Sequence, residues 1–416
     1  MNNKLDKIFE IVSFYDNARW SRKENYNLIN FYKEGLNDDT KLLTHWLCYI
    51  TNRQMGFERI FDIGGFVFSE LVDRFKKNET IDWFTLLDPN NKESFIRKDT
   101  DDKEEYSFIG KNLPNDLIRK DYSDNIENNQ VVFKSRFLPT DYFSILCTLD
   151  ILEKYGKSLS CFISDIYKIH KDDKKNLVRK ILFSLHLLSY NNIGQKKYLD
   201  VGNVEISYIR NRSNKVRDIL MEQNKNEFNA RFEKFAKEKI FRQKRAWCCL
   251  RDFLKSPEFK QYFIESMSTK ELDKEELKEL FSNEMLSQLE LPGDVWNNSP
   301  KFQRCVRNIS DGQIEKRYDE SKFNQFVRKK YDDSQILKSG IAYPEQFDIT
   351  FDFVPRMCDK NSCDICPIGL LYGKGENFEN ICSNNASKFC PVALVGCGYR
   401  KTCDGHNECE LRKVIL

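Results

Sequence analysis

Residues 177–188 read Leu-Val-Arg-Lys-Ile-Leu-Phe-Ser-Leu-His-Leu-Leu, and their apolar pattern indicates the fold class of the chain. Leu177, Ile181, Leu182, Leu185 and Leu188 fall three or four positions apart along one face of an α-helix. An apolar face of this kind must be buried against other elements, because water would otherwise cover it at a cost in free energy. The stretch therefore predicts a helix within a hydrophobic core.

Helical patterns extend over most of the chain, and we expect helices over 1–90, 138–190 and 213–287. Gly64 and Gly65 indicate a break or a close contact in the first block, and Thr140-Asp141 is a suitable helix start in the second. The nearly unbroken apolar run 42–50 is typical of a buried helix. The fold class predicted from these patterns is mainly α.

Strands are expected in two places only. Residues 198–209 alternate enough for a short strand or hairpin with Gly202-Asn203 at its turn, and 346–354 alternate before the cysteine-rich end. Residues 90–130 are rich in Asp and Asn and weakly periodic, which predicts a long polar loop. The chain of 416 residues is long enough for two or three domains. We expect an N-terminal helical region over 1–130, a helical domain over 131–345 and a cysteine-rich module over 346–416.

The C-terminal segment holds eight of the protein's 14 cysteines. They are Cys358, Cys363, Cys366, Cys382, Cys390, Cys397, Cys403 and Cys409. No run of 18 apolar residues exists, and the charged N-terminus does not suit a signal peptide, so a cytoplasmic protein without a membrane span is expected. Thiols stay reduced there, and a dense cluster of them therefore indicates a metal site, small and irregular in fold, and not a disulfide framework.

The spacing of the cysteines favours an iron–sulfur centre over zinc. Cys358, Cys363 and Cys366 follow C-x4-C-x2-C, the spacing of plant-type [2Fe–2S] ferredoxins, and Cys397 lies where a fourth ligand is possible. Zinc ribbons normally carry two C-x2-C pairs, and only one is present. Eight sulfurs suffice for two four-ligand sites, including [4Fe–4S] clusters, or for one site and four structural thiols, and His406 is either a further ligand or a surface residue. We expect buried core thiols at Cys48, Cys147, Cys161, Cys248, Cys249 and Cys305.

A basic helical stretch lies between Glu205 and Lys255, with fourteen Arg or Lys and seven Asp or Glu. Cationic helices with interleaved aromatic residues neutralise phosphates and stack on bases, so the pattern predicts contact with DNA or RNA. The residues expected to make it are Arg210, Arg212, Lys215, Lys239, Arg242, Lys244 and Arg245. The alternative is a set of solvated helix faces whose basic residues pair with the interspersed acids.

The sequence carries no nucleotide-binding loop, dinucleotide fingerprint, GxSxG or HExxH motif. The candidate catalytic carboxylates are Asp294, Asp348 and Asp352, because they flank a turn and the cysteine module. Asp348 and Asp352 would share one face of the expected strand, where paired carboxylates can hold Mg²⁺, but no lysine follows at the spacing usual in nucleases. His45 and His186 are expected to be packed core residues.

The stretch Leu291-Pro292-Gly293 resembles the opening of the hairpin in helix–hairpin–helix DNA glycosylases, some of which carry a cysteine-ligated [4Fe–4S] cluster near the C-terminus. Val295 stands where the second hairpin glycine would be, and the cysteine spacing of those enzymes is not reproduced. A plain turn between two helices is the preferred interpretation of Pro292-Gly293, and no catalytic residue is carried over from the resemblance.

These patterns lead to one leading hypothesis and two alternatives. The first is a protein that binds or processes nucleic acid, glycosylase- or nuclease-like if it is an enzyme, with a C-terminal module folded around one or two metal centres. The second is an iron–sulfur redox or electron-transfer enzyme. The third is a zinc-stabilised protein-interaction module.

Overall fold

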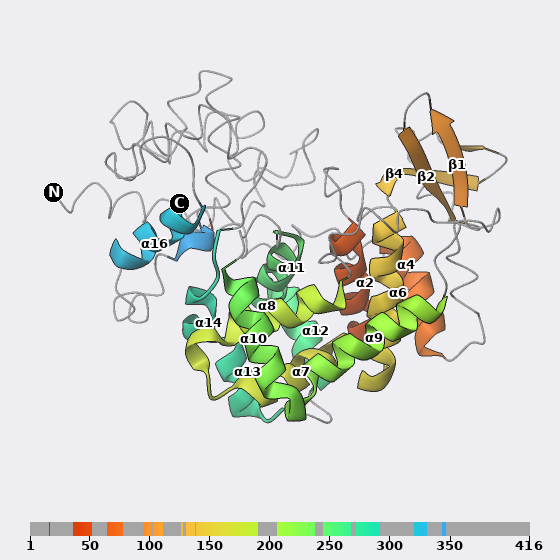
Figure 1. Cartoon of the computed structure of the whole chain (residues 1–416). Coiled ribbons are helices and arrows are strands. Elements are labelled where there is room, and N and C mark those ends of the chain that lie inside the picture. Colours follow the sequence, from red (N-terminus) through yellow and green to blue (C-terminus); the bar gives the residue numbers. More distant parts are fainter. Residues whose placement is uncertain are drawn as a thin grey trace, which may run out of the picture. The chain divides into compact units, whose positions relative to one another are not determined.

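The computed structural model describes the helices and strands of the chain and a few flanking residues (Figure 1). The described residues are 16, 36–51, 65–77, 95–100, 103–110, 126–127, 130–137, 139–189, 206–237, 244–267, 272–291, 320–330 and 343–346. They are mostly helical, as the apolar spacing predicted. The expected cysteine-rich module lies outside them.

The chain divides into two compact units, which are described separately. The α2 unit comprises Asn27–Lys237 and Gln261–Lys274, and the α11 unit comprises Met1–Tyr26, Glu238–Lys260 and Glu275–Leu416. The predicted domain boundaries at 130 and 345 stay a prediction.

Helix α2 (Asp38–Thr51) is the central helix of the α2 unit, and nearly all its side chains are buried. It begins after Asn37, whose Oδ1 accepts a hydrogen bond from the backbone N–H of Thr40 at 2.8 Å, the usual chemistry of an N-cap. Helices α4 (Gly65–Lys76), α6 (Pro139–Leu152) and α7 (Leu159–His170) pack around it. The start of α4 at Gly65 agrees with the break predicted at Gly64-Gly65.

The stretch 177–188 forms helix α8 (Leu177–Leu188), as predicted, and packs against α6 and α7. Short 3-10 turns, η5 (Glu153–Tyr155) and η6 (Lys174–Asn176), connect these helices. Gly156 follows η5 with φ of 62°, a left-handed conformation that glycine adopts without strain.

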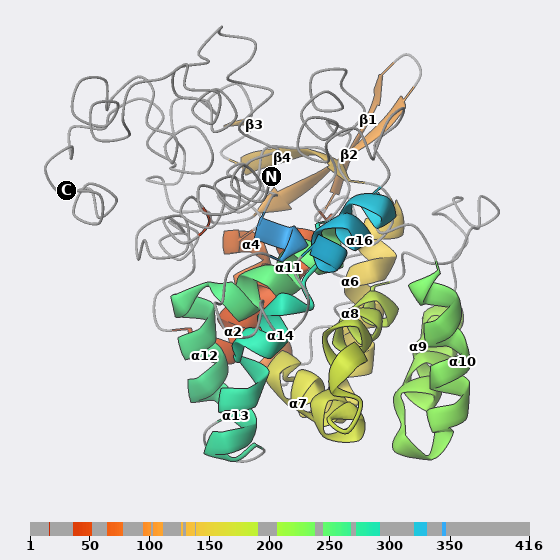
Figure 2. The same ribbon diagram turned by 90° about the vertical axis from the view of Figure 1, so that its left-hand side faces the viewer.

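Helices α9 (Ile206–Leu220) and α10 (Lys225–Ala236) lie side by side and are joined by η9 (Glu222–Asn224), as Figure 2 shows. We call these three elements the α9–α10 hairpin. The prediction of a strand over 198–209 is wrong for 206–209, which form the first turn of α9. The reason is that Ser213, Val216 and Leu220 continue a buried face at helical spacing.

Four antiparallel strands form a sheet in the order β1-β2-β4-β3. They are β1 (Phe95–Thr100), β2 (Lys103–Gly110), β3 (Ile126–Glu127) and β4 (Gln130–Phe137). Lys98 lies opposite Glu105, and Phe108 lies opposite Phe133, with a register shift between Tyr106 and Ser107. The prediction of a long polar loop over 90–130 is wrong for 95–100, 103–110 and 126–127, which form strands. Charged residues obscure the alternation in β1 and β2, while antiparallel pairing satisfies their backbone groups.

The α11 unit is built on α11 (Lys244–Lys255), which is followed by α12 (Pro257–Met267), α13 (Lys274–Leu280) and α14 (Asn283–Ser287). Helix α12 passes from this unit into the α2 unit at residue 261. Helix α16 (Glu320–Lys330) and the 3-10 turn η12 (Pro344–Gln346) contact each other in the same unit. The strand predicted for 346–354 lies outside the described residues beyond Gln346.

Buried aromatic side chains form the core of the α11 unit, chiefly Trp247, Phe253, Phe259 and Phe323. The rings of Phe253 and Phe259 meet edge to face with centroids 5.8 Å apart, a geometry that aromatic pairs favour. Within the described part of the chain, no helix has both the length and the apolar character needed to cross a membrane.

Candidate functional site

Three of the predicted phosphate-contacting residues lie together on α9. Arg210 and Lys215 are exposed, Arg212 is half-buried, and Asn211 and Asn214 are exposed beside them. The opposite face of α9 carries the buried residues that attach it to the α2 unit. The helix therefore presents a basic and amide-rich face to solvent, which is the composition expected of a surface that contacts phosphates.

A buried arginine fixes the rotation of α9. The Nη2 group of Arg217 donates to the backbone oxygen of Asp150 at 2.5 Å and to its Oδ2 atom at 2.7 Å. The Nη1 group donates to Oδ1 of Asn214 at 2.7 Å. Charge-assisted hydrogen bonds of this kind are directional as well as strong, so they hold α9 against α6 with Arg210 and Lys215 directed outward.

Buried phenylalanines pack helix α10 against α8. Phe228, Phe232 and Phe235 are buried, and the ring of Phe183 on α8 lies 5.1 Å from Phe228 and 4.9 Å from Phe235, centroid to centroid. The solvent side of the α9–α10 hairpin is mixed in charge. Its exposed basic residues are Arg210, Lys215, Lys225, Arg231 and Lys234, and its exposed acids are Asp218, Glu222, Glu227 and Glu233.

His170 lies under α10 and is buried, with its ring stacked on Phe228 at 4.3 Å. Burial, together with the charges of Lys180 and Lys225, lowers the pKa of His170 to about 4, while the charge of Asp173 opposes this shift. An imidazolium at this position would be desolvated beside two ammonium groups. His170 is therefore neutral at physiological pH.

The lowered pKa of His170 predicts an acid-dependent loss of stability. Between pH 6.5 and about 4 the unfolded chain binds a proton at this residue and the folded chain does not, so folding becomes less favourable as the pH falls through that window. The full effect is at most about 3 kcal/mol. In His170→Phe, which keeps a ring against Phe228, the free energy of unfolding measured with urea should depend less on pH in this window. An unchanged pH dependence would contradict the assignment.

The other predicted basic residues lie outside the described residues of the α2 unit. Lys239 and Arg242 lie outside the described residues, as does the side chain of Lys244, the first residue of α11. Arg245 is half-buried on α11, which belongs to the other unit. Among the described residues of the α2 unit, Arg210, Arg212 and Lys215 are the predicted residues that lie on one helix.

Two further basic residues of the stretch, Arg251 and Lys255, are buried in a group of charges that we call the Lys255 centre. The Nζ atom of Lys255 donates to Oδ1 and Oδ2 of Asp16 at 2.7 and 2.6 Å and to Oε2 of Glu345 at 2.5 Å. The ammonium also lies 5.0 Å from the centre of the Tyr343 ring. The side chains of Asp16, Lys255 and Glu345 are 5% exposed or less.

Arg251 extends the Lys255 centre. Its Nε atom lies 3.1 Å from Oδ1 of Asp252 and 3.7 Å from Oε1 of Glu345. Burial tends to lower the pKa of Lys255, but the charges of Asp16 and Glu345 outweigh it, and the pKa is raised. Burial raises the pKa of Glu345, and Lys255 opposes that shift. Lys255 is consequently a charged structural residue, not a neutral amine that can act as a nucleophile.

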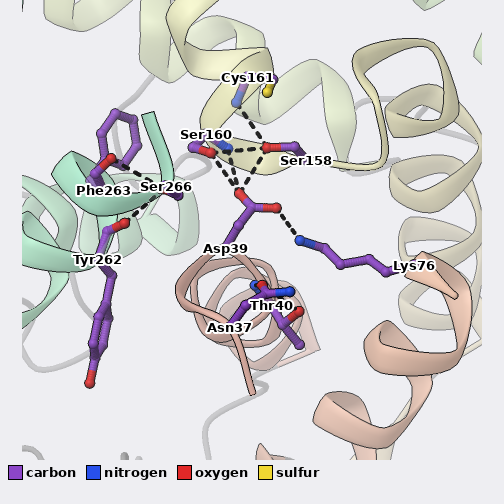
Figure 3. Close-up of polar contacts among 10 residues, drawn as sticks. All are labelled: Asn37, Asp39, Thr40, Lys76, Ser158, Ser160, Cys161, Tyr262, Phe263 and Ser266. Carbon is purple, nitrogen blue, oxygen red and sulfur yellow. Dashed lines mark hydrogen bonds and ion pairs between the residues drawn. The ribbon is translucent and has the colours of Figure 1, made fainter. Parts of the chain in front are cut away.

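A second buried carboxylate, Asp39, joins three helices of the α2 unit (Figure 3). Its Oδ1 atom accepts hydrogen bonds from Oγ of Ser158 at 2.9 Å, Oγ of Ser160 at 2.7 Å and N of Ser160 at 3.0 Å. Its Oδ2 atom pairs with the ammonium of Lys76 at the end of α4. Because Ser158 caps α7 and accepts from N of Cys161 at 3.1 Å, the carboxylate lies at the positive end of that helix.

Cysteines outside the C-terminal segment behave largely as predicted. Cys48, Cys147, Cys248 and Cys249 are buried, whereas Cys161 is only half-buried. Burial raises the pKa of Cys48 well above its ordinary value and that of Cys147 to about 12, so neither forms a thiolate at neutral pH. Cys305 lies outside the described residues. His45 and His186 are buried, as predicted.

The predicted metal and catalytic residues cannot be placed. All eight cysteines from Cys358 to Cys409, together with His406, Asp294, Asp348 and Asp352, lie outside the described residues. Among the residues that the structure does describe, no three His, Cys, Asp or Glu side chains form a group suited to hold a metal ion. The metal centre and the carboxylate pair stay predictions from sequence.

Comparisons with known proteins give no assignment. The chain matches no protein-family model, no curated protein and no solved structure.

Proposed function

We propose that the protein binds nucleic acid through the exposed face of α9 and carries a cysteine-ligated metal centre in its C-terminal segment. The observation that carries the first part is the joint exposure of Arg210 and Lys215 with Asn211 and Asn214. Basic side chains neutralise phosphates and amides donate to phosphate and sugar oxygens. The buried Arg217–Asp150 pair supports this assignment because it fixes the face toward solvent.

The nucleic-acid interface predicts salt-dependent binding that weakens when α9 loses charge. Arg210→Gln/Lys215→Gln should bind labelled DNA or RNA about tenfold more weakly at low salt, and the slope of log K against log salt should fall by about 1.4 to 1.8, since each phosphate contact contributes about 0.7 to 0.9. Fluorescence anisotropy over a salt titration measures both quantities.

A control is Lys278→Gln on α13, in the α11 unit. Lys278 is exposed and pairs with Glu275 at 2.6 Å, so this variant removes one positive charge, against two in the α9 variant, from a helix that is not part of the proposed interface. It should bind like the unmodified protein. Absence of binding by the unmodified protein at low salt, with its metal content intact, would overturn the proposed interface.

On this proposal the eight cysteines from Cys358 to Cys409 hold one or two iron–sulfur clusters, with zinc as the alternative. Their soft thiolates and irregular spacing suit a cluster held by loops, and the metal would fold a segment that has few expected helices or strands. Protein purified without oxygen should absorb visible light and contain iron and inorganic sulfide in similar amounts. Zinc without colour would favour the interaction module, and a reversible redox couple would favour the electron-transfer enzyme. Absence of iron and zinc would contradict the metal centre.

A further inference from the structure

Helix α16 has one buried and one exposed face in the α11 unit. Phe323, Asn324 and Val327 are buried. The solvent side carries exposed Lys322, Gln325 and Lys329 with half-buried Phe326 among them. Residues 322, 325, 326 and 329 follow the three- and four-residue spacing of one helical face, so they form a continuous stripe, which we call the α16 stripe.

Polar contacts fix the rotation of α16 beneath the stripe. Oδ1 of Asn324 accepts a hydrogen bond from N of Leu291 at 3.1 Å. Nη2 of Arg328 donates to the backbone oxygen of Gln288 at 3.0 Å, and its Nε atom lies 3.9 Å from Oε1 of Glu290. The buried ring of Phe323 lies 6.5 Å from that of Phe326, centroid to centroid, and supports it from below. The stripe is therefore held outward on an anchored helix.

We infer that the α16 stripe binds single-stranded nucleic acid, an inference that rests on the proposed function and adds a second surface to it. Lys322 and Lys329 are seven residues apart, about 10 Å along the axis, and Phe326 lies between them. Two ammonium groups flanking an accessible ring match the chemistry of a single strand, whose phosphates meet the lysines while an unpaired base stacks on the ring. Gln325 supplies an amide for sugar or base oxygens.

The aromatic residue distinguishes a single strand from a duplex. Bases of a duplex are stacked on each other and cannot reach a ring on the surface of a helix, whereas unpaired bases stack freely on aromatic side chains. A surface that reads phosphates alone would not need Phe326 to be partly accessible. The α16 stripe should accordingly prefer a single strand over a duplex of the same length.

The test uses the full chain with fluorescein-labelled oligo-dT, oligo-rU and a DNA duplex, each about 20 nucleotides long, a length sufficient for one or a few binding surfaces. Lys322→Gln/Lys329→Gln should weaken binding of the single strands about tenfold and lower the salt slope by about 1.4. Phe326→Leu keeps the apolar contact with Phe323 but removes the stacking face. It should weaken binding about fivefold or more and leave the salt slope unchanged. Comparison of oligo-dT with oligo-rU shows whether DNA or RNA is preferred.

The outcomes separate this inference from the proposed function. If the α16 variants bind single strands like the unmodified protein while Arg210→Gln/Lys215→Gln binds more weakly, the α16 inference is overturned and the proposed function stands. If Phe326→Leu weakens duplex and single-strand binding equally, the assignment to a single strand is overturned. If the unmodified protein binds none of the three probes at low salt, both are overturned. Thermal unfolding of each variant confirms that its fold is intact.

Discussion

Lys255→Met is expected to lower the free energy of unfolding of the α11 unit by about 3–5 kcal/mol, because it removes the ammonium that two buried carboxylates share. Asp16 and Glu345 lose their shared ammonium donor, and neither side chain is accessible to water that could replace it. Methionine keeps much of the apolar volume of the lysine stem, so the loss measures the charge and not a cavity. Urea unfolding followed by tryptophan fluorescence, to which buried Trp247 of this unit and buried Trp46 of the α2 unit both contribute, measures the loss.

Two further variants test the origin of the effect at Lys255. Lys278→Met removes an exposed lysine, 72% accessible and paired with Glu275, and should cost less than about 0.5 kcal/mol. Lys255→Met/Glu345→Gln should recover part of the stability because one stranded carboxylate is removed. The deficit of Lys255→Met should also shrink as the pH falls, since burial raises the pKa of Glu345 and the protonated group carries no charge. A deficit below about 1 kcal/mol at neutral pH would contradict the structural role.

Asp39→Ala is expected to destabilise the α2 unit by about 3 kcal/mol. The substitution removes the acceptor of three hydrogen bonds from Ser158 and Ser160 and leaves the ammonium of Lys76 without its partner (Figure 3). Asp39→Asn retains an oxygen acceptor but not the charge, and its loss of stability should lie between those of the alanine variant and the unmodified protein. Urea unfolding followed by circular dichroism gives these free energies.

The neighbouring residue Asp38 is a close control for Asp39. Both carboxylates lie in the first turn of α2, so both interact favourably with the helix dipole. Asp38, however, pairs with Lys41 three residues away, at 2.9 Å, and is 22% exposed. Asp38→Ala should therefore cost about 0.5 kcal/mol. Equal losses for the two alanine variants would show that the dipole, and not the links to α4 and α7, explains the effect of Asp39.

Local patterns predicted the helices because helical spacing is visible within a short window. The face formed by Leu177, Ile181, Leu182, Leu185 and Leu188 is buried in α8, as its spacing required. The strands between 95 and 137 were missed because strand pairing depends on partners that sequence periodicity does not show, and the polar residues of β1 and β2 resemble those of a loop.

The buried polar groups could not be predicted because their partners are distant in sequence. Asp39 and Ser160 are 121 positions apart, and Lys255 and Asp16 are 239 apart. The local sequence indicates only the helix starts next to the Asp39 contacts, through the capping residues Asn37 and Ser158. For the same reason, the number of basic residues between 205 and 255 predicted more exposed positive charge than the structure has there. Arg217, Arg251 and Lys255 look like surface residues in the sequence, but each is paired with a buried carboxylate.

The division of the chain into units has a consequence for the order in which they fold during synthesis. Almost all of the α2 unit comes from one continuous segment, Asn27–Lys237, which is synthesised before α11. The Lys255 centre, by contrast, needs Asp16, which is synthesised before the α2 unit, and Glu345, which is synthesised after α11. Since domains fold as their residues emerge, the α2 unit should become protease-resistant on the ribosome first. Asp16 is therefore synthesised more than three hundred residues before Glu345, the last member of the Lys255 centre to be made.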